Sequence, residues 1–258
     1  MTMLSQIKLK DIATLLGSLC GFFAIFLSIS SYHAYRLAMA IIFLGIVLDT
    51  LDGYIARKLN QANEFGKELD SLSDSFAFGI APAIVTFVVY SQQPNTPTGI
   101  EGFSIWIMFV PSFIFIVGAL IRLAHFNINE SEGYIGVPTP TTAGLLVLFS
   151  LIDYYSFVAF SKDGNPLIFN YIIHFSIPFI LIILAWLNVT NKISYGKTVR
   201  HKTGKLRILL YGILIAILTL FILIVFFSDK AAIPIVIILS ILLTIVVGFI
   251  ITGFFPKK

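Results

Sequence analysis

Long apolar runs alternate with short polar segments along almost the whole chain. Eight of the runs are long enough for a membrane-spanning helix, which takes about 20 mostly apolar residues. These predicted helices cover approximately residues 12–31, 34–57, 70–91, 103–126, 140–160, 167–190, 207–228 and 232–254. The pattern predicts an all-α fold, a polytopic bundle of transmembrane helices.

The last two predicted helices form an addition to the six that precede them. A strongly basic segment, residues 191–206, separates them from the sixth helix, and a short Ser-Asp-Lys-Ala turn joins them to each other. We therefore expect a six-helix core over residues 1–200 and a two-helix C-terminal extension over residues 201–258.

The composition agrees with a multi-pass protein of the cell membrane. Hydrophobic residues make up 58% of the chain and charged residues 12%. The charged share is about half of what soluble domains usually have. A soluble domain, a disordered chain and a nucleic-acid-binding protein are excluded on this ground, and the expected surroundings are membrane lipids.

The distribution of Lys and Arg predicts the side of the membrane that each loop faces. With the N-terminus in the cytoplasm, 14 of the 17 Lys and Arg residues lie on the cytoplasmic side, and Arg36, Lys162 and Lys230 lie on the other. Cytoplasmic loops carry the excess of positive charge in membrane proteins. Both termini are therefore predicted to be cytoplasmic.

One polar segment places four carboxylates at helical spacing. It reads DTLDGYIARKLNQANEFGKELDSLSD and runs from Asp49 to Asp74. Asp49 and Asp52 end the second predicted helix, and Asp70 and Asp74 begin the third. Residues three or four apart share a helix face. In the predicted topology all four carboxylates lie at the cytoplasmic side of the membrane.

The four aspartates predict a metal site. Carboxylates gathered near a membrane repel one another unless cations neutralise them. Hard divalent cations with oxygen ligands fit such a site, and an oxygen-rich site accepts both Mg²⁺ and Mn²⁺. Two ions about 4 Å apart can stabilise the attacking and leaving oxygens of a displacement at phosphorus. We therefore expect Mg²⁺ or Mn²⁺, with two ions in the site.

Small and basic residues accompany the aspartates. Gly53 and Ala56 continue the face of the first aspartate pair, where small side chains let a flat ligand approach the backbone. Arg57 follows with a planar donor suited to phosphate. Gly66 is expected in the connecting loop, where it would admit a sugar or base. Together they predict a diphosphate-containing nucleotide bridged by the cations.

Other polar and aromatic residues receive ordinary interpretations. Carboxylates at a membrane boundary are often solvated helix ends, and this applies to the lone aspartates Asp11, Asp153, Asp163 and Asp229. Aromatic side chains near helix ends are typical of interfacial anchors. Those interpreted in this way are Tyr90, Trp106, Tyr154, Tyr155 and Trp186.

The aspartate segment resembles a known family signature. Its pattern, Asp-x2-Asp-Gly-x2-Ala-Arg-x8-Gly-x3-Asp-x3-Asp, matches the signature of the CDP-alcohol phosphotransferase family at every defined position. The resemblance implies a membrane enzyme with a six-helix core, usually a homodimer. Such an enzyme moves a phosphoalcohol group from a CDP-linked donor to an alcohol and releases CMP.

The resemblance also implies a role for each residue of the signature. The metal ligands would be Asp49, Asp52, Asp70 and Asp74. The nucleotide and phosphate contacts would come from Gly53, Ala56, Arg57 and Gly66. Asp74 would in addition act as the catalytic base.

Three further segments resemble the serine-using branch of this family. Residues 78–83 read Phe-Gly-Ile-Ala-Pro-Ala, and Asp70 is followed by Ser71 where glycerophosphate-using relatives typically have Asp-Pro. Residues 118–127 resemble the branch's Arg-Leu-Ala-Arg-Phe-Asn stretch with a histidine in place of one arginine. Residues 133–144 resemble its Gly-x-Pro-x-Pro-x-x-Ala-Gly stretch. The implied substrates are a CDP-activated diradylglycerol lipid and L-serine.

Arg122 and His125 are candidates for binding the acceptor or a phosphate, because they are expected beside the aspartates and an intramembrane arginine is costly. The alternative for Arg122 is a snorkelling topology anchor. Two alternatives to the activity stay open. One is the same chemistry with inositol phosphate, glycerol phosphate or choline as acceptor. The other is a cation transporter, which would place its carboxylates near the membrane midplane.

Overall fold

The computed structural model describes residues 8–31, 34–59, 64–91, 96, 98–128, 136–161, 165–193, 219–220 and 228–254, without the side chains of 9, 10, 51–59, 228, 229 and 254. The regular elements in this part of the chain are helices. They are α1 (Leu9–Ser30), α2 (Tyr35–Leu59), α3 (Glu64–Asp74), the π-helical segment η3 (Ser75–Ile80), α4 (Ala81–Ser91), α5 (Ile105–Ile128), α6 (Thr139–Phe160), α7 (Ile168–Val189), the 3-10 turn η4 (Ser228–Ala231) and α10 (Ala232–Phe254).

The predicted all-α membrane bundle is confirmed. Six helical segments are long and apolar enough to cross a membrane, and α2 occupies a seventh predicted span. The six are Asp11–Ser30, Glu64–Ser91, Ile105–Ile128, Thr139–Phe160, Ile168–Val189 and Ala232–Gly253. The predicted span at 207–228 lies almost wholly outside the described residues.

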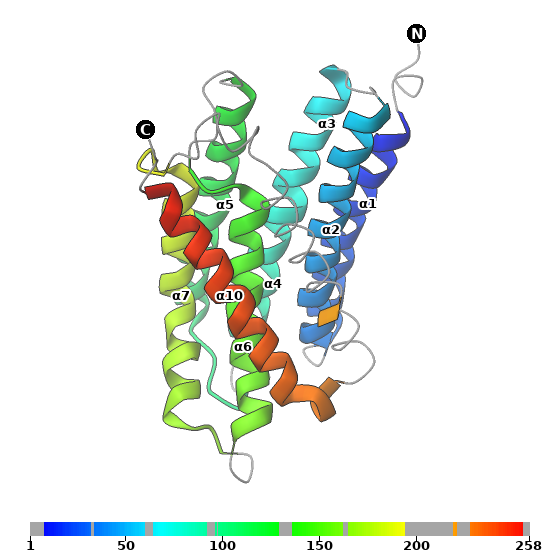
Figure 1. Ribbon diagram of the computed structural model, residues 1–258. Helices are drawn as coiled ribbons and strands as arrows, with labels where there is room; N and C mark the ends of the chain where they lie inside the picture. The colour runs from blue at the N-terminus through cyan, green and yellow to red at the C-terminus, as the bar shows by residue number, and fades with distance from the viewer. Residues whose placement is uncertain are drawn as a thin grey trace.

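Helices α1 to α7 run side by side along one bundle axis, as Figure 1 shows. α1 packs on α2 and on the continuous rod formed by α3, η3 and α4, while α5 packs on α7 and α10 lies obliquely across α6. α1 begins and α10 ends at the same end of the bundle, which is also the end where α3 begins. The signature aspartates lie on α2 and on the rod of α3, η3 and α4, which are called the aspartate helices, and the rod is called the aspartate rod. Both pack on α1.

Small residues allow the helices to pack closely. A Cβ at Gly118 of α5 would lie 2.9 Å from the carbonyl oxygen of Ala185 in α7, and one at Gly21 of α1 would lie 3.1 Å from Cα of Ala77. Helix association within a membrane depends on such close backbone approach, since burial of apolar surface gives little advantage in lipid. These crossings bring α5 onto α7 and α1 onto the aspartate rod.

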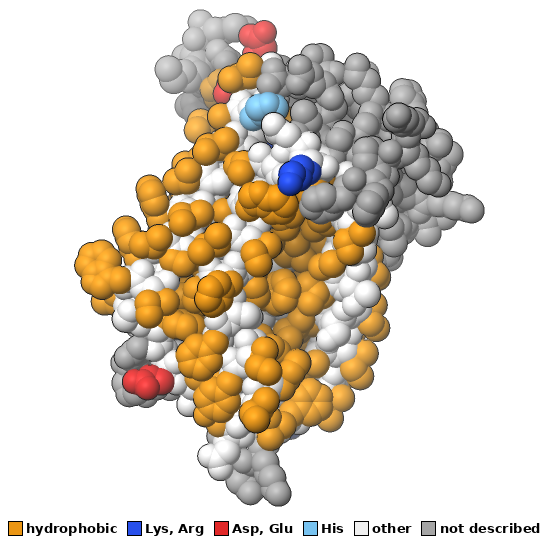
Figure 2. All heavy atoms as spheres, turned by 90° about the vertical axis from the view of Figure 1, so that its left-hand side faces the viewer, with side chains coloured by type: hydrophobic (Ala, Val, Ile, Leu, Met, Phe, Trp, Pro, Cys, Tyr) orange, Lys and Arg blue, Asp and Glu red, His pale blue; other side chains and the backbone are white. Residues whose placement is uncertain are grey.

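The outer surface of α5 and α7 is almost wholly apolar. Figure 2 shows a continuous belt of hydrophobic side chains on this side of the molecule, with the charged side chains confined to its two ends. Exposed residues of the belt include Trp106, Phe113, Ile172 and Phe179. A surface of this kind faces the hydrocarbon of a bilayer, where exposed polar groups are costly.

Two of the predicted interfacial anchors are not at the surface. Tyr90 and Tyr155 are buried inside the bundle, whereas Trp106 and Trp186 are exposed as expected. The interpretation of the two tyrosines as membrane anchors is therefore wrong. Their hydroxyl groups lie where only a partner within the protein can satisfy them, because lipid offers none.

A candidate metal centre between three helices

Three of the four signature aspartates meet in space. Carboxylate oxygens of Asp49, Asp70 and Asp74 lie within 4.8 Å of one another, and all three side chains are partly buried. Asp49 comes from α2, and Asp70 and Asp74 come from successive turns of α3. The predicted four-residue spacing thus places two carboxylates opposite a third from the neighbouring helix.

The three carboxylates fit a hard divalent cation. They supply oxygen donors, the ligand type that Mg²⁺ and Mn²⁺ prefer. Three negative charges this close to one another, and partly withdrawn from water, raise the free energy of the empty site. A bound cation removes that repulsion, so the arrangement is suited to hold one.

The other half of the signature lies on the last turns of α2. Asp52, Gly53, Ala56 and Arg57 continue this helix beyond Asp49. Asp52 follows Asp49 by about one turn and so shares its face. The side chains of these residues lie outside the described part of the chain, and their contributions to metal and nucleotide binding stay predictions.

A small open pocket adjoins the carboxylates. It is lined by Thr14 and Gly17 of α1, Asp49 of α2, Ser73 and Asp74 of α3, and Phe78 of η3. Three separate parts of the sequence therefore contribute to one cavity with carboxylates on its wall. A pocket with convergent polar groups at its rim is the usual form of a small-molecule site.

Ser73 fastens α1 to the aspartate rod at this pocket. Its hydroxyl donates to the carbonyl oxygen of Thr14 at 2.8 Å and shares a hydrogen bond with the hydroxyl of Ser18. Ser73 directly precedes Asp74, so the bond fixes the position of α1 beside the carboxylate. Sequence reasoning missed this serine, although a small polar residue on a rod that α1 must contact was a possible signal.

A π-helical segment follows Asp74 at once. It covers Ser75–Ile80, and the backbone N–H of Ala81 donates to the carbonyl of Phe76 in the wider π pattern. Pro82 explains this locally, since proline has no N–H to donate to the carbonyl four residues before it. Single π turns inside α-helices often occur at functional sites, and here the turn forms the pocket wall at Phe78.

The expected loop position of Gly66 is wrong. α3 begins at Glu64, six residues before the predicted span, so Gly66 lies inside a helix and is buried there. The polar stretch before Asp70 continues the helix because Glu, Lys and Leu are good helix formers. Gly66 therefore offers its helix surface, not a loop, to any ligand.

Arg122 is buried in α5 and secures the segment before α6. Its Nε donates to the carbonyl of Val137 at 3.2 Å, and its guanidinium carbon lies 5.4 Å from the ring centre of Phe126. Burial of Arg122 excludes the alternative of a snorkelling anchor.

The neighbour of Val137, Gly136, has φ +74°, and a Cβ there would lie 2.5 Å from the carbonyl oxygen of Asn188. His125 lies on the exposed side of the last turn of α5.

The end of α5 also contacts the aspartate rod through Asn127. Its side-chain oxygen accepts from the hydroxyl of Ser71 at 2.9 Å, and its carbonyl accepts from Nζ of Lys67 at 3.3 Å. Ser71 and Lys67 lie within one turn of Asp70 on α3. An amide, a hydroxyl and an ammonium group are thus gathered next to the carboxylates.

Asp153 is a buried residue in a separate polar cluster, so its interpretation as a solvated helix end is wrong. Its Oδ2 accepts from the hydroxyl of Tyr90 at 2.8 Å and lies 3.2 Å from Nδ1 of His174. No linear spacing links Asp153 with residues on other helices, so the sequence could not reveal this cluster.

Asp11 is also buried and is not a solvated helix end. Its carboxylate accepts from the backbone N–H of Lys8 at 2.7 Å and caps α1.

Comparison with known proteins supports a common origin for this site. The model of the CDP-alcohol phosphatidyltransferase family matches residues 8–162, which include all four signature aspartates. The chain is 36% identical to the CDP-diacylglycerol–serine O-phosphatidyltransferase of Methanocaldococcus jannaschii, over 58% of this chain and 64% of the relative. It is 30% identical to the enzyme of that name from Saccharomyces cerevisiae, over 67% and 68%. Identity to the archaetidylserine synthase of Methanothermobacter thermautotrophicus is 31%, over 59% and 61%. The chain thus spans about two thirds of the length of these relatives.

Proposed function

Because the chain belongs to the CDP-alcohol phosphatidyltransferase family, we propose that it transfers a phosphatidyl-type group from a CDP-activated diradylglycerol lipid to L-serine and releases CMP. The observation that carries the proposal is the convergence of Asp49, Asp70 and Asp74. The choice of serine rests on the similarity to relatives named for serine transfer. The donor is left as a diradylglycerol because one relative is named as an archaetidylserine synthase.

The proposed chemistry is an in-line displacement at the phosphorus next to the lipid. Asp49, Asp52, Asp70 and Asp74 would hold one or two Mg²⁺ or Mn²⁺ ions, which when bound neutralise the pyrophosphate and the departing CMP. Asp74 accepts the proton of the serine hydroxyl as general base. The serine oxygen then forms a bond to the phosphorus, and the bond from that phosphorus to the oxygen of CMP breaks.

Donor binding is proposed at the end of α2 and the start of α3. Gly53, Ala56 and Gly66 would lie against the cytidine, and Arg57 would donate to a phosphate. The apolar belt of the bundle leaves the lipid tails in the bilayer while the nucleotide reaches the carboxylates. This arrangement keeps the reacting phosphorus at the membrane surface.

Acceptor binding is proposed where α5 meets α3. Free serine carries an ammonium and a carboxylate, so its site needs both acceptors and cationic donors. Lys67, Ser71 and Asn127 supply an ammonium, a hydroxyl and an amide beside Asp70. Arg122 and His125 of the same helix end remain candidates for contacts to the serine carboxylate or a donor phosphate.

We also propose the assembly and orientation that the sequence predicts. The chain would be a homodimer in the cell membrane, with both termini and the carboxylates facing the cytoplasm. Residues 1–200 would form the catalytic core and residues 201–258 an extension. The matched family region ends within the core, and α10 of the extension packs across α6.

Serine-dependent release of CMP tests the proposal. Purified protein in detergent is offered a CDP-diacylglycerol or its ether-linked counterpart, with Mg²⁺ or Mn²⁺ and with serine, inositol phosphate or glycerol phosphate. We expect CMP only when serine, a CDP-lipid and a divalent cation are all present. Release with a different acceptor alone would refute the serine assignment, and no release with any acceptor would favour a transporter, which needs no nucleotide.

The Asp74→Asn variant tests the proposed base. Loss of general-base catalysis lowers turnover by about 100- to 10,000-fold, while binding of the CDP-lipid stays largely intact. Glu101→Gln, which neutralises an exposed carboxylate between α4 and α5, is the matched control and should keep full activity. Unchanged turnover in Asp74→Asn, with the fold intact, would remove this residue from the base role.

A further inference from the structure

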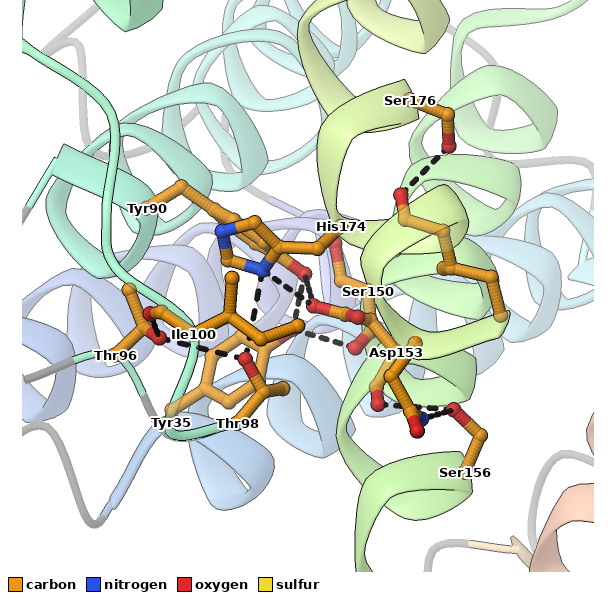
Figure 3. Close-up of polar contacts among 12 residues, drawn as sticks. Tyr35, Tyr90, Thr96, Thr98, Ile100, Ser150, Asp153, Ser156, His174 and Ser176 are labelled. Atoms are coloured by element: carbon orange, nitrogen blue, oxygen red, sulfur yellow. Dashed lines mark hydrogen bonds and ion pairs between the residues drawn. The ribbon is translucent and has the colours of Figure 1, made fainter. Parts of the chain in front are cut away.

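A second polar cluster lies inside the bundle at the opposite end of the aspartate helices. Its centre is the pair of Asp153 on α6 and His174 on α7, which are 1% and 0% exposed. Figure 3 shows the two side chains meeting beside the hydroxyl group of Tyr90, which is linked in turn to the hydroxyl group of Tyr35. None of these residues contributes to the proposed chemistry, so the cluster needs an explanation of its own.

The two tyrosines connect the cluster to the helices that carry the carboxylates. Tyr35 is the first residue of α2, and its hydroxyl donates to the carbonyl of Ser150 at 2.6 Å. Tyr90 lies in the last turn of α4 and donates to Asp153 at 2.8 Å. The two hydroxyl oxygens are 3.5 Å apart. α2 and the α3–α4 rod are therefore joined to each other and to α6 at one level.

The connection between α4 and α5 covers the cluster. The ring of Phe103 stacks on the ring of His174 with centroids 5.3 Å apart. The backbone N–H of Phe103 donates to the backbone carbonyl of Tyr90 at 2.8 Å. The hydroxyl of Thr98 lies 3.4 Å from Nδ1 of His174. Hydrogen bonds sealed from water in this way are strong, and removing one partner leaves the others unsatisfied.

The distances along the helices relate this cluster to the metal centre. Asp49 lies about 21 Å along α2 from Tyr35 at the rise of an α-helix. Asp74 lies about 24 Å from Tyr90 by the same measure, less the shortening by the wider π turn of η3. Each rod thus carries a tyrosine near one end and an aspartate at a similar distance from it. Fixing the tyrosines at one level places the carboxylates at one level.

We propose that Tyr35, Tyr90 and the Asp153–His174 pair are positioning residues that hold α2 and the α3–α4 rod in the axial register of the metal centre. A slip of one residue moves a helix by about 1.5 Å, and a misplacement of about 1 Å can already disable a site. The cluster thereby sets the affinity of the three carboxylates for their cation. This inference rests on the proposed function only in requiring that the site binds a divalent cation.

Binding of Mn²⁺ to variants that lack one hydroxyl group tests the inference. Tyr35→Phe and Tyr90→Phe are purified in detergent, and bound Mn²⁺ is measured by electron paramagnetic resonance and by the rise of the unfolding temperature with added Mn²⁺. We expect the half-saturating Mn²⁺ concentration to increase about three- to tenfold over the unmodified protein. Neither readout depends on turnover.

Ser156→Ala is the matched control. Ser156 accepts a hydrogen bond from the side-chain nitrogen of Asn170 at 2.9 Å, so it also joins α6 to α7 and is fully buried. Its hydroxyl donates to the backbone carbonyl of Asp153 within α6 at 3.1 Å, and in the described part of the bundle it makes no hydrogen bond to α2 or α4. We expect a lower unfolding temperature in this variant with the Mn²⁺ affinity of the unmodified protein.

The outcomes separate the two proposals. If the unmodified protein does not bind Mn²⁺, the proposed metal site fails and this inference fails with it. If the unmodified protein binds Mn²⁺ and both tyrosine variants bind it equally well, with only a lower unfolding temperature, the cluster is merely structural and the inference alone is overturned. Should Tyr90→Phe not fold, Tyr35→Phe decides, because it leaves the Asp153–His174 pair intact.

Discussion

At the scale of single residues, the side chains beside the aspartates bear on the choice of acceptor in the proposed reaction. Ser71 and Asn127 bring polar groups from two helices to within one turn of Asp70. Inositol phosphate and glycerol phosphate are anionic acceptors, whereas serine carries both charges. A site that combines a hydroxyl and an amide with cationic groups and the nearby Asp70 carboxylate suits the zwitterion better than a dianion.

Ser71→Ala tests this acceptor site. Loss of the hydroxyl removes the hydrogen bond to Asn127 and a potential contact to serine, worth about 1.5–3 kcal/mol where the partner is charged. We expect the KM for serine to rise about tenfold or more, with little change in the KM for the CDP-lipid. Steady-state release of CMP at varied serine and varied lipid separates the two constants.

Ser75→Ala is the control for this substitution. Ser75 begins η3, one turn further along the same rod, and its hydroxyl donates to the carbonyl of Leu72 near the end of α3 at 2.8 Å. Its removal should leave both KM values unchanged. Equal effects of the two substitutions would mean that Ser71 influences the rod in general and not the acceptor.

At the scale of elements, close helix crossings position α5 beside the aspartate rod. α5 contacts α7 at Gly118, where a Cβ would lie within 3.1 Å of three atoms of Ala185. The same helix supplies Asn127 and Arg122 to the site region. Any separation of α5 from α7 therefore disturbs the contacts of α5 with α3.

Gly118→Ala and Gly248→Ala form a matched pair, since each adds one methyl group to a membrane helix. The first must push α7 away and should cost about 1–3 kcal/mol of stability. The second, on α10, has nothing within 4 Å of its added Cβ and should cost nothing. The apparent unfolding temperature in detergent should fall for Gly118→Ala alone. A fall of equal size in both would contradict the packing argument.

Residue spacing predicted the helices well, because the length of an apolar run and the 3.6-residue period of a helix are both properties of one continuous stretch of chain. It placed Asp70 and Asp74 on one helix face. It failed at Gly66, where good helix formers extended α3 past the expected boundary. The π turn at η3 was not predicted either, although Pro82 gives its local cause.

At the scale of the whole molecule, contacts between distant helices could not be predicted from spacing. Asp153 and His174 meet because α6 and α7 pack antiparallel, and Tyr35 and Tyr90 join them from two further helices. The sequence predicted that Asp49 joins Asp70 and Asp74 only because the signature includes residues of both helices. A cluster without such a pattern becomes visible only when the helices are placed.

The predicted orientation of the bundle in the membrane concerns the whole molecule and can be measured. Glu64 begins α3 at the end of the bundle where α1 begins and α10 ends, and Glu101 lies in the connection between α4 and α5 at the other end. Both residues are exposed. The excess of Lys and Arg predicts that the Glu64 end is cytoplasmic, which agrees with the proposed CDP-lipid donor.

Cysteine labelling tests this orientation, since Cys20 is the chain's single cysteine and can be replaced by alanine. In that background, Glu101→Cys should react with a membrane-impermeant maleimide in intact cells, and Glu64→Cys only after the cells are lysed. Two controls are needed: both variants should react equally after lysis, and the protein without cysteine should not react. Differences in intact cells then report only the side of the membrane on which each cysteine lies. Labelling of Glu64→Cys in intact cells would place Asp49, Asp70 and Asp74 outside the cytoplasm, where the proposed donor nucleotide is not supplied.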